Sequence, residues 1–115
     1  MTDTLESFRH FREKMNAAIL AADNLTINRF FALDTRTYEA GALPAKTKEL
    51  MALAIAQITQ CPWCIDAHSK NSIKAGASDA EIAETTFVAM AMAAGAAWSH
   101  GGLALQCTEA HRAKS

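Results

Sequence analysis

Residues that favour turns are scarce in this chain, and that scarcity constrains the fold more than any other feature. Only five glycines and two prolines occur among 115 residues. A β-sandwich or β-barrel needs many turns, and turns draw on these residues. Alanine, leucine and methionine are plentiful instead. The sequence therefore predicts an all-α fold.

The length of 115 residues predicts one globular domain over residues 1–115, because chains of this size usually form a single domain. Half of the residues are apolar, and 11 basic against 12 acidic residues give a net charge of −1. Without a basic excess we expect no nucleic-acid partner. The acidic N-terminus and the absence of a long uninterrupted apolar stretch predict no signal peptide, no membrane span and a cytoplasmic location.

Apolar spacing and capping residues predict the first three helices. Asp3 and Glu6 are placed as a capping box for a first helix ending near residues 23–24. A second helical stretch covers Leu25 to Tyr38 and ends near Gly41. Pro44 suits the first turn of a third helix, in which apolar residues recur at helical spacing.

A fourth helix is predicted to have Cys61 as its N-cap, Pro62 at its first position and Gly76 just after its end at Ala75. Ser78 and Glu81 form a further capping box. The following run, residues 87–98, is apolar nearly all the way round, so we expect a second subunit to bury it. Gly101 and Gly102 are expected to bend or fray the chain before a last helix near residues 103–109, followed by a loose tail.

Three side chains with thiol or proton-transfer chemistry share one face of the fourth helix. Cys61, Cys64 and His68 are three and four residues apart, which stacks them. The N–H groups and the dipole at a helix N-terminus stabilise a thiolate. His68 can exchange a proton with Cys64. Glu49, on the preceding helix, is expected to lie next to His68 as a carboxylate that orients the imidazole.

The spacing Glu49-x11-Cys61-x2-Cys64-x3-His68 resembles the signature of the AhpD-like alkylhydroperoxidases, within the carboxymuconolactone decarboxylase superfamily. The resemblance extends from about Leu43 to Ala97, and the Phe-rich N-terminal region is similar to the peroxidase-related subset. It implies an all-α, AhpD-like domain that assembles as homo-trimers or homo-hexamers, and peroxide reduction by a cysteine pair without any cofactor or metal.

The resemblance also implies roles for individual residues. Cys64 would be the peroxidatic thiol, Cys61 would resolve its sulfenic acid or supply a proton, and Glu49 with His68 would form a proton relay. The implied partners are a small peroxide and a dithiol protein or small thiol as reductant. Better-studied members carry histidine immediately before the second cysteine, where this chain has Trp63, so one proton carrier is missing. Trp63 and His100 are candidate substrate-binding residues.

Other functions stay open at this point. A thiol-disulfide oxidoreductase would use the same cysteines without peroxide. A lactone decarboxylase-type enzyme fits the superfamily but has no need of the pair. A non-catalytic oligomeric protein could sense oxidants or bind a partner. A zinc site on Cys61, Cys64 and His68 would need a fourth ligand from Glu49, His100 or Cys107.

Overall fold

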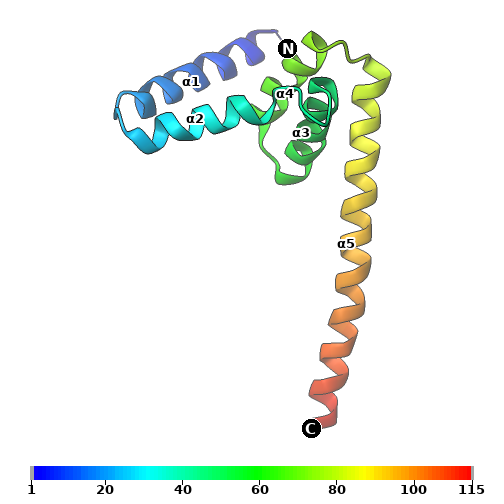
Figure 1. Cartoon of the computed structure of the whole chain (residues 1–115). Coiled ribbons are helices and arrows are strands. Elements are labelled where there is room, and N and C mark those ends of the chain that lie inside the picture. Colours follow the sequence, from blue (N-terminus) through cyan, green and yellow to red (C-terminus); the bar gives the residue numbers. More distant parts are fainter. Residues whose placement is uncertain (1, 115) are drawn as a thin grey trace. The chain divides into compact units, whose positions relative to one another are not determined.

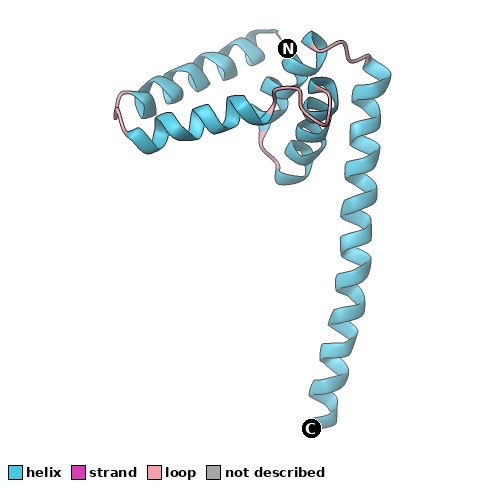
Figure 2. Ribbon diagram, in the orientation of Figure 1, coloured by secondary structure: helices cyan, strands magenta, loops and turns pink. Residues whose placement is uncertain are grey.

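The computed structural model describes residues 2–114, and they form five helices and no strand (Figure 2). The helices are α1 (Thr2–Leu20), α2 (Leu25–Thr37), α3 (Ala45–Thr59), α4 (Pro62–Lys74) and α5 (Asp79–Lys114) (Figure 1). The predicted all-α fold is confirmed. The chain divides into two compact units, Met1–Ala45 and Lys46–Ser115. Whether residues 1–115 act as one domain stays a prediction.

The first unit is built from α1 and α2. α1 begins at Thr2, so Asp3 lies in its first turn and not at the predicted N-cap, and it ends at Leu20, before the predicted position. Asn24 caps α2 by accepting the N–H of Thr26 at 2.8 Å. No residue of α2 is buried, and Phe30 and Leu33 are largely exposed.

The second unit brings α3 and α4 together through a connection of only two residues. Gln60 takes a left-handed backbone conformation (φ 58°), and the N–H of Cys61 bonds back to the carbonyl of Ala56 at 3.1 Å. This is the hydrogen-bond pattern of a Schellman motif, which ends a helix sharply. The carbonyl of Cys61 then accepts the N–H of Ile65, so the residue whose N–H completes the end of α3 also caps the start of α4.

The turn between α4 and α5 follows the sequence prediction. Gly76 has φ 92°, and the N–H of Ala77 returns to the carbonyl of Ser72, which forms a second Schellman motif. Ser78 and Glu81 exchange side-chain-to-backbone hydrogen bonds of 2.9 and 3.1 Å, as a capping box requires. The Ser78 N–H, together with Lys46 at 2.9 Å, holds the pKa of the Glu81 carboxyl below its usual value.

The core of this unit is small and contains polar groups. Leu53 and Ala56 of α3 are buried with Ala89 of α5. Between the same two helices, Gln57 donates to Thr85 Oγ1 at 3.0 Å and accepts from Thr86 Oγ1 at 2.6 Å. Since Thr85 is itself buried, these bonds fix how α3 lies against the first part of α5.

α5 is one continuous helix of 36 residues, which corrects two expectations. Gly101 and Gly102 do not bend or fray it, and residues 110–114 are helical. A glycine costs a helix only about 1 kcal/mol, and the alanine- and leucine-rich flanks carry the helix through. Every residue from Met90 to Lys114 is exposed, and Trp98 is 86% exposed, so one chain alone does not bury this part of the helix.

By length and composition α5 would suffice to cross a membrane, which the sequence reading did not anticipate. Core helices of soluble proteins also meet that description. α5 runs past α3 and α4 (Figure 1), and no Asp, Glu, Lys or Arg occurs between Glu84 and Glu109.

Candidate redox site

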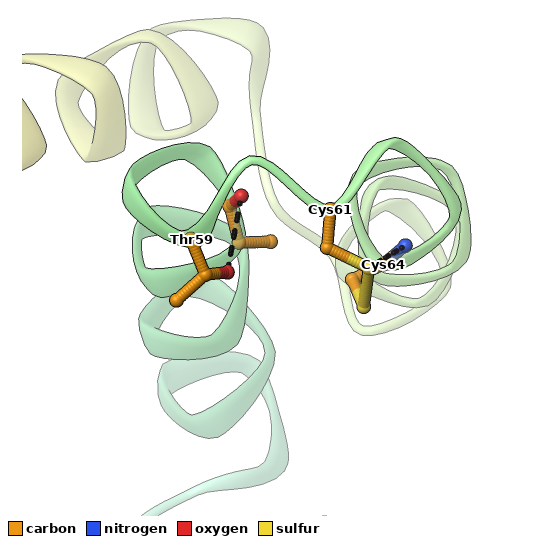
Figure 3. The surroundings of a disulfide bond; sticks show 4 residues. Thr59, Cys61 and Cys64 are labelled. Atoms are coloured by element: carbon orange, nitrogen blue, oxygen red, sulfur yellow. Dashed lines mark hydrogen bonds between the residues drawn. A yellow bond between two sulfur atoms is a disulfide. The ribbon is translucent and has the colours of Figure 1, made fainter.

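The two cysteines of the Cys-x-x-Cys motif are joined by a disulfide at the N-terminus of α4 (Figure 3). Their Cα atoms are 5.2 Å apart, within the usual range for a disulfide. Cys61 is the N-cap, as predicted, and its Sγ accepts the backbone N–H of Cys64 at 3.3 Å. Pro62 occupies the first helical position, where its missing N–H costs nothing.

A buried acid–histidine pair joins α3 to α4 beside this motif. Glu49 Oε2 lies 2.7 Å from His68 Nδ1, and their side chains are 8% and 15% exposed. Burying a carboxylate among apolar groups is costly without a partner, and His68 provides one. The sequence reading expected this contact, and the structure contains it.

The arrangement has a defined proton-transfer capacity. When the Glu49 carboxylate accepts the Nδ1–H of His68, Nε2 of the neutral ring carries the lone pair. His68 follows Cys64 by one helical turn on the same face. The two helices therefore hold a disulfide, an imidazole and a carboxylate, the groups that redox and proton-transfer chemistry uses.

The other predicted site residues are placed differently. Trp63 is partly buried in the first turn of α4, between the two cysteines. His100 is exposed on α5. Cys107 is a free, exposed thiol. Among residues 2–114 the structure contains no group of three or more His, Cys, Asp or Glu side chains that could hold a metal ion.

Sequence reasoning missed a groove between α3 and α5. It encloses about 570 Å³ and is lined mainly by apolar side chains, with Lys46, Glu81 and Glu84 among its polar residues. The apolar lining residues are Leu50, Met51, Ala54, Ile55, Ile58, Val88, Ala89 and Met92. None of the four residues of the Glu49–His68 signature lines it. The apolar residues of α3 were the sequence signal for this groove. A solvated helix face is polar, whereas Met51, Ile55 and Ile58 are exposed and apolar.

The sequence profile of the carboxymuconolactone decarboxylase family matches residues 25–106. The chain belongs to this family. The match runs from the start of α2 to residue 106 of α5 and includes the disulfide and the Glu49–His68 pair. The resemblance drawn from the Glu49-to-His68 signature is thereby confirmed at the level of the family.

Two relatives extend the comparison. Protein 4 in the cox locus of Paracoccus denitrificans is 46% identical over 76 residues, which are 66% of this chain and 68% of that protein. An alkyl hydroperoxide reductase of Mycobacterium tuberculosis is 35% identical over 66 residues, which are 57% of this chain. This chain corresponds to only 19% of that second protein's length.

Solved structures of family members share the fold. A crystal structure of a Thermotoga maritima protein has a TM-score of 0.65 and 38% identity, covering 70% of this chain and 72% of that one. Another crystal structure of that protein places it in the carboxymuconolactone decarboxylase family, with a suggested part in the antioxidative response. A Legionella pneumophila family member, solved in its apo form, has a TM-score of 0.53 and 34% identity, covering 79% of this chain and 74% of that chain.

Proposed function

We propose that this family member is a thiol-dependent peroxidase that reduces a small peroxide through the Cys61–Cys64 pair. The observation that supports it most is the disulfide at the start of α4, beside the buried Glu49–His68 contact of 2.7 Å. An acid–histidine pair next to a redox-active sulfur is the arrangement that proton-coupled thiol chemistry needs.

The proposed cycle assigns one role to each residue. As His68 takes the thiol proton, Cys64 Sγ attacks a peroxide oxygen; the O–O bond breaks, and an S–O bond forms. The leaving alcohol or water receives its proton from His68, and Glu49 keeps the ring oriented. Cys61 then attacks the sulfenic acid on Cys64, and water leaves as the disulfide forms. A dithiol reductant restores both thiols by exchange.

The relatives support this function over its rivals. One relative is an alkyl hydroperoxide reductase, and the Thermotoga maritima protein has a suggested part in an antioxidative response. The family name also covers decarboxylases, but such a reaction has no use for a disulfide. A thiol-disulfide oxidoreductase remains the second candidate, because the same bond could exchange with a protein disulfide without peroxide.

The proposal includes self-assembly and a cytoplasmic location. A run of 24 uncharged residues from Thr85 to Thr108 is mostly exposed in one chain, and an exposed apolar surface of this kind marks an interaction site. We assign it to contacts between copies in a homo-trimer or homo-hexamer. A reducing cytoplasm would supply the thiol reductant.

Single-cysteine variants test the peroxidase activity. Cys64→Ser is expected to abolish peroxide consumption, and Cys61→Ser is expected to leave a sulfenic acid that a dimedone probe traps on Cys64. Cys107→Ser is the matched control, because Cys107 is free and exposed, and it should keep the full rate. Full activity in Cys64→Ser would contradict the assigned role. Inertness of the parent protein toward peroxide, with rapid exchange toward disulfides, would favour the oxidoreductase.

A further inference from the structure

The two sulfurs of the pair differ in what surrounds them, although both lie in the first turn of one helix. Cys61 is the N-cap, and its Sγ accepts the N–H of Cys64 at 3.3 Å. The dashed line that ends at the nitrogen of Cys64 in Figure 3 marks this bond, which is local to the turn. Cys64 lies at the third helical position, one turn before His68 and its Glu49 partner.

These surroundings act on different forms of a thiol. A backbone N–H and the positive end of the helix dipole stabilise a negative charge on sulfur whether or not any reaction is under way. An imidazole takes a proton during reaction and returns it afterwards. The hydrogen bond and the helix dipole maintain a thiolate at rest, whereas the imidazole forms a thiolate only during the reaction.

We propose that Cys61 is the resident thiolate of the reduced protein and the leaving sulfur when the disulfide is reduced, so that an incoming thiol attacks Cys64. This deepens the proposed function and rests on it for the reductant. It also decides between the two roles that the family resemblance leaves open for Cys61: Cys61 resolves the sulfenic acid as a thiolate and does not supply a proton, and the departing hydroxide takes its proton from solvent.

The reduction step then has a fixed direction. The thiolate of a dithiol reductant attacks Cys64 Sγ, and a new S–S bond forms there. The Cys61–Cys64 bond breaks, and its electron pair goes to Cys61 Sγ, which the Cys64 N–H stabilises. The second thiol of the reductant gives its proton to His68 and attacks the reductant's own sulfur in the mixed disulfide. Cys64 leaves and takes that proton back from His68. The reductant is oxidised by two electrons, and the protein disulfide is reduced by two.

The direction follows from leaving-group chemistry. Thiol-disulfide exchange is faster when the departing sulfur is the more acidic thiol. A hydrogen bond that favours the charged form makes Cys61 that thiol. Pro62 at the first helical position has no N–H to donate to Cys61 Sγ. The hydrogen bond to Cys61 comes from the N–H of Cys64.

The test uses the reduced parent protein and needs no variant. Brief alkylation with iodoacetamide at a series of pH values, from about 5 to about 9, followed by peptide mass spectrometry, gives a rate for each cysteine. The pH midpoint of each rate profile reports thiolate formation separately from access. Cys61 is expected to have the lower midpoint, with a difference of about one pH unit or more, and to react first at acidic pH.

Two variants sharpen the result. The ultraviolet thiolate absorbance of Cys64→Ser, which keeps Cys61, should appear at lower pH than that of Cys61→Ser. Replacing His68 with Gln should shift the alkylation profile of Cys64 and leave that of Cys61 in place. A lower midpoint for Cys64, or equal midpoints, would overturn the inference.

Peroxide consumption by the same preparation separates this inference from the function that it deepens. Activity together with a lower Cys64 midpoint would refute the inference alone. A lower Cys61 midpoint without peroxide turnover would leave the assignment of the thiolate intact and refute the peroxidase.

Discussion

The α3–α4 pair and the part of α5 from Met90 onward differ in whether their side chains find partners within the chain. Between α3 and α4, a charged side chain is buried and finds its partner within the molecule, as Glu49 and His68 show at 2.7 Å. On α5, from Met90 onward, apolar side chains are exposed and find none there. The first region pairs its buried polar groups within one chain, whereas the second exposes apolar surface of the kind that marks an interaction site. The proposed site and the proposed assembly surface should therefore be separable by mutation.

The largest expected effect comes from neutralising the buried carboxylate. Glu49→Gln keeps the side-chain shape but removes the charge that orients His68, so peroxide consumption should fall by about 10²-fold. Stopped-flow measurement of the rate across pH tests this, because loss of the relay should change the shape of the profile as well as its height.

Glu84→Gln is the matched control for that experiment. It makes the same change at an exposed position of α5, so it should keep the rate and the profile. An unchanged pH–rate profile in Glu49→Gln would refute the relay.

The second effect is on assembly. Trp98→Glu places a charge in the uncharged run of α5, and burying that charge against a second copy should weaken association at least about tenfold. Sedimentation velocity over a concentration series measures it. Ala113→Glu adds the same charge in the last turn and should leave the mass unchanged. If the parent protein sediments as a monomer, the assembly assignment is wrong.

Two buried hydroxyl groups give a smaller effect. They test whether the polar groups buried among α3, α4 and α5 have hydrogen-bond partners. Thr85→Val removes the hydroxyl that accepts a hydrogen bond from Gln57 and should lower the free energy of unfolding by about 1–3 kcal/mol. Ser72 is fully buried, and within residues 2–114 its Oγ has no hydrogen-bond partner. Ser72→Ala should therefore be neutral or stabilise by about 1 kcal/mol. Urea titration measures the free energy of unfolding of both variants. Equal losses would show that the Ser72 hydroxyl has a hydrogen-bond partner outside the described chain.

The smallest effect concerns the exposed start of α5. Folding lowers the pKa of Glu81, so its stabilising contribution is present above the unfolded pKa and is lost as pH falls through the folded value. Glu81→Gln should therefore show a shallower acid-side loss of stability than the parent. Urea midpoints at neutral pH and at about pH 3 measure the difference, and parallel losses would show that the capping box does not contribute.

Many of the helix ends among α3, α4 and α5 could be predicted from sequence, because the residues that mark them are close together in the chain. The Cys61 cap, the Gly76 stop and the Ser78–Glu81 box each depend on a few adjacent residues, and the structure contains all three. The end of α3 is harder to predict, because Gln60 adopts a conformation that usually selects glycine.

Features that depend on how helices pack could not be read from the chain. The Gln57 hydrogen bonds and the groove between α3 and α5 depend on the register of two helices that lie about 30 residues apart in sequence. The straight course of α5 through Gly101 and Gly102 was missed for another reason. Two glycines weaken a helix but do not end it when no competing turn or proline follows.

The most direct test of the account is an intact mass and thiol count on reduced, metal-free protein before and after one equivalent of peroxide. A redox-active Cys61–Cys64 pair should lose two thiols and two hydrogens, mapped by peptide analysis to these two residues, with Cys107 still free. An unchanged mass and three remaining thiols would contradict it, and lactone substrates would then be the next to assay.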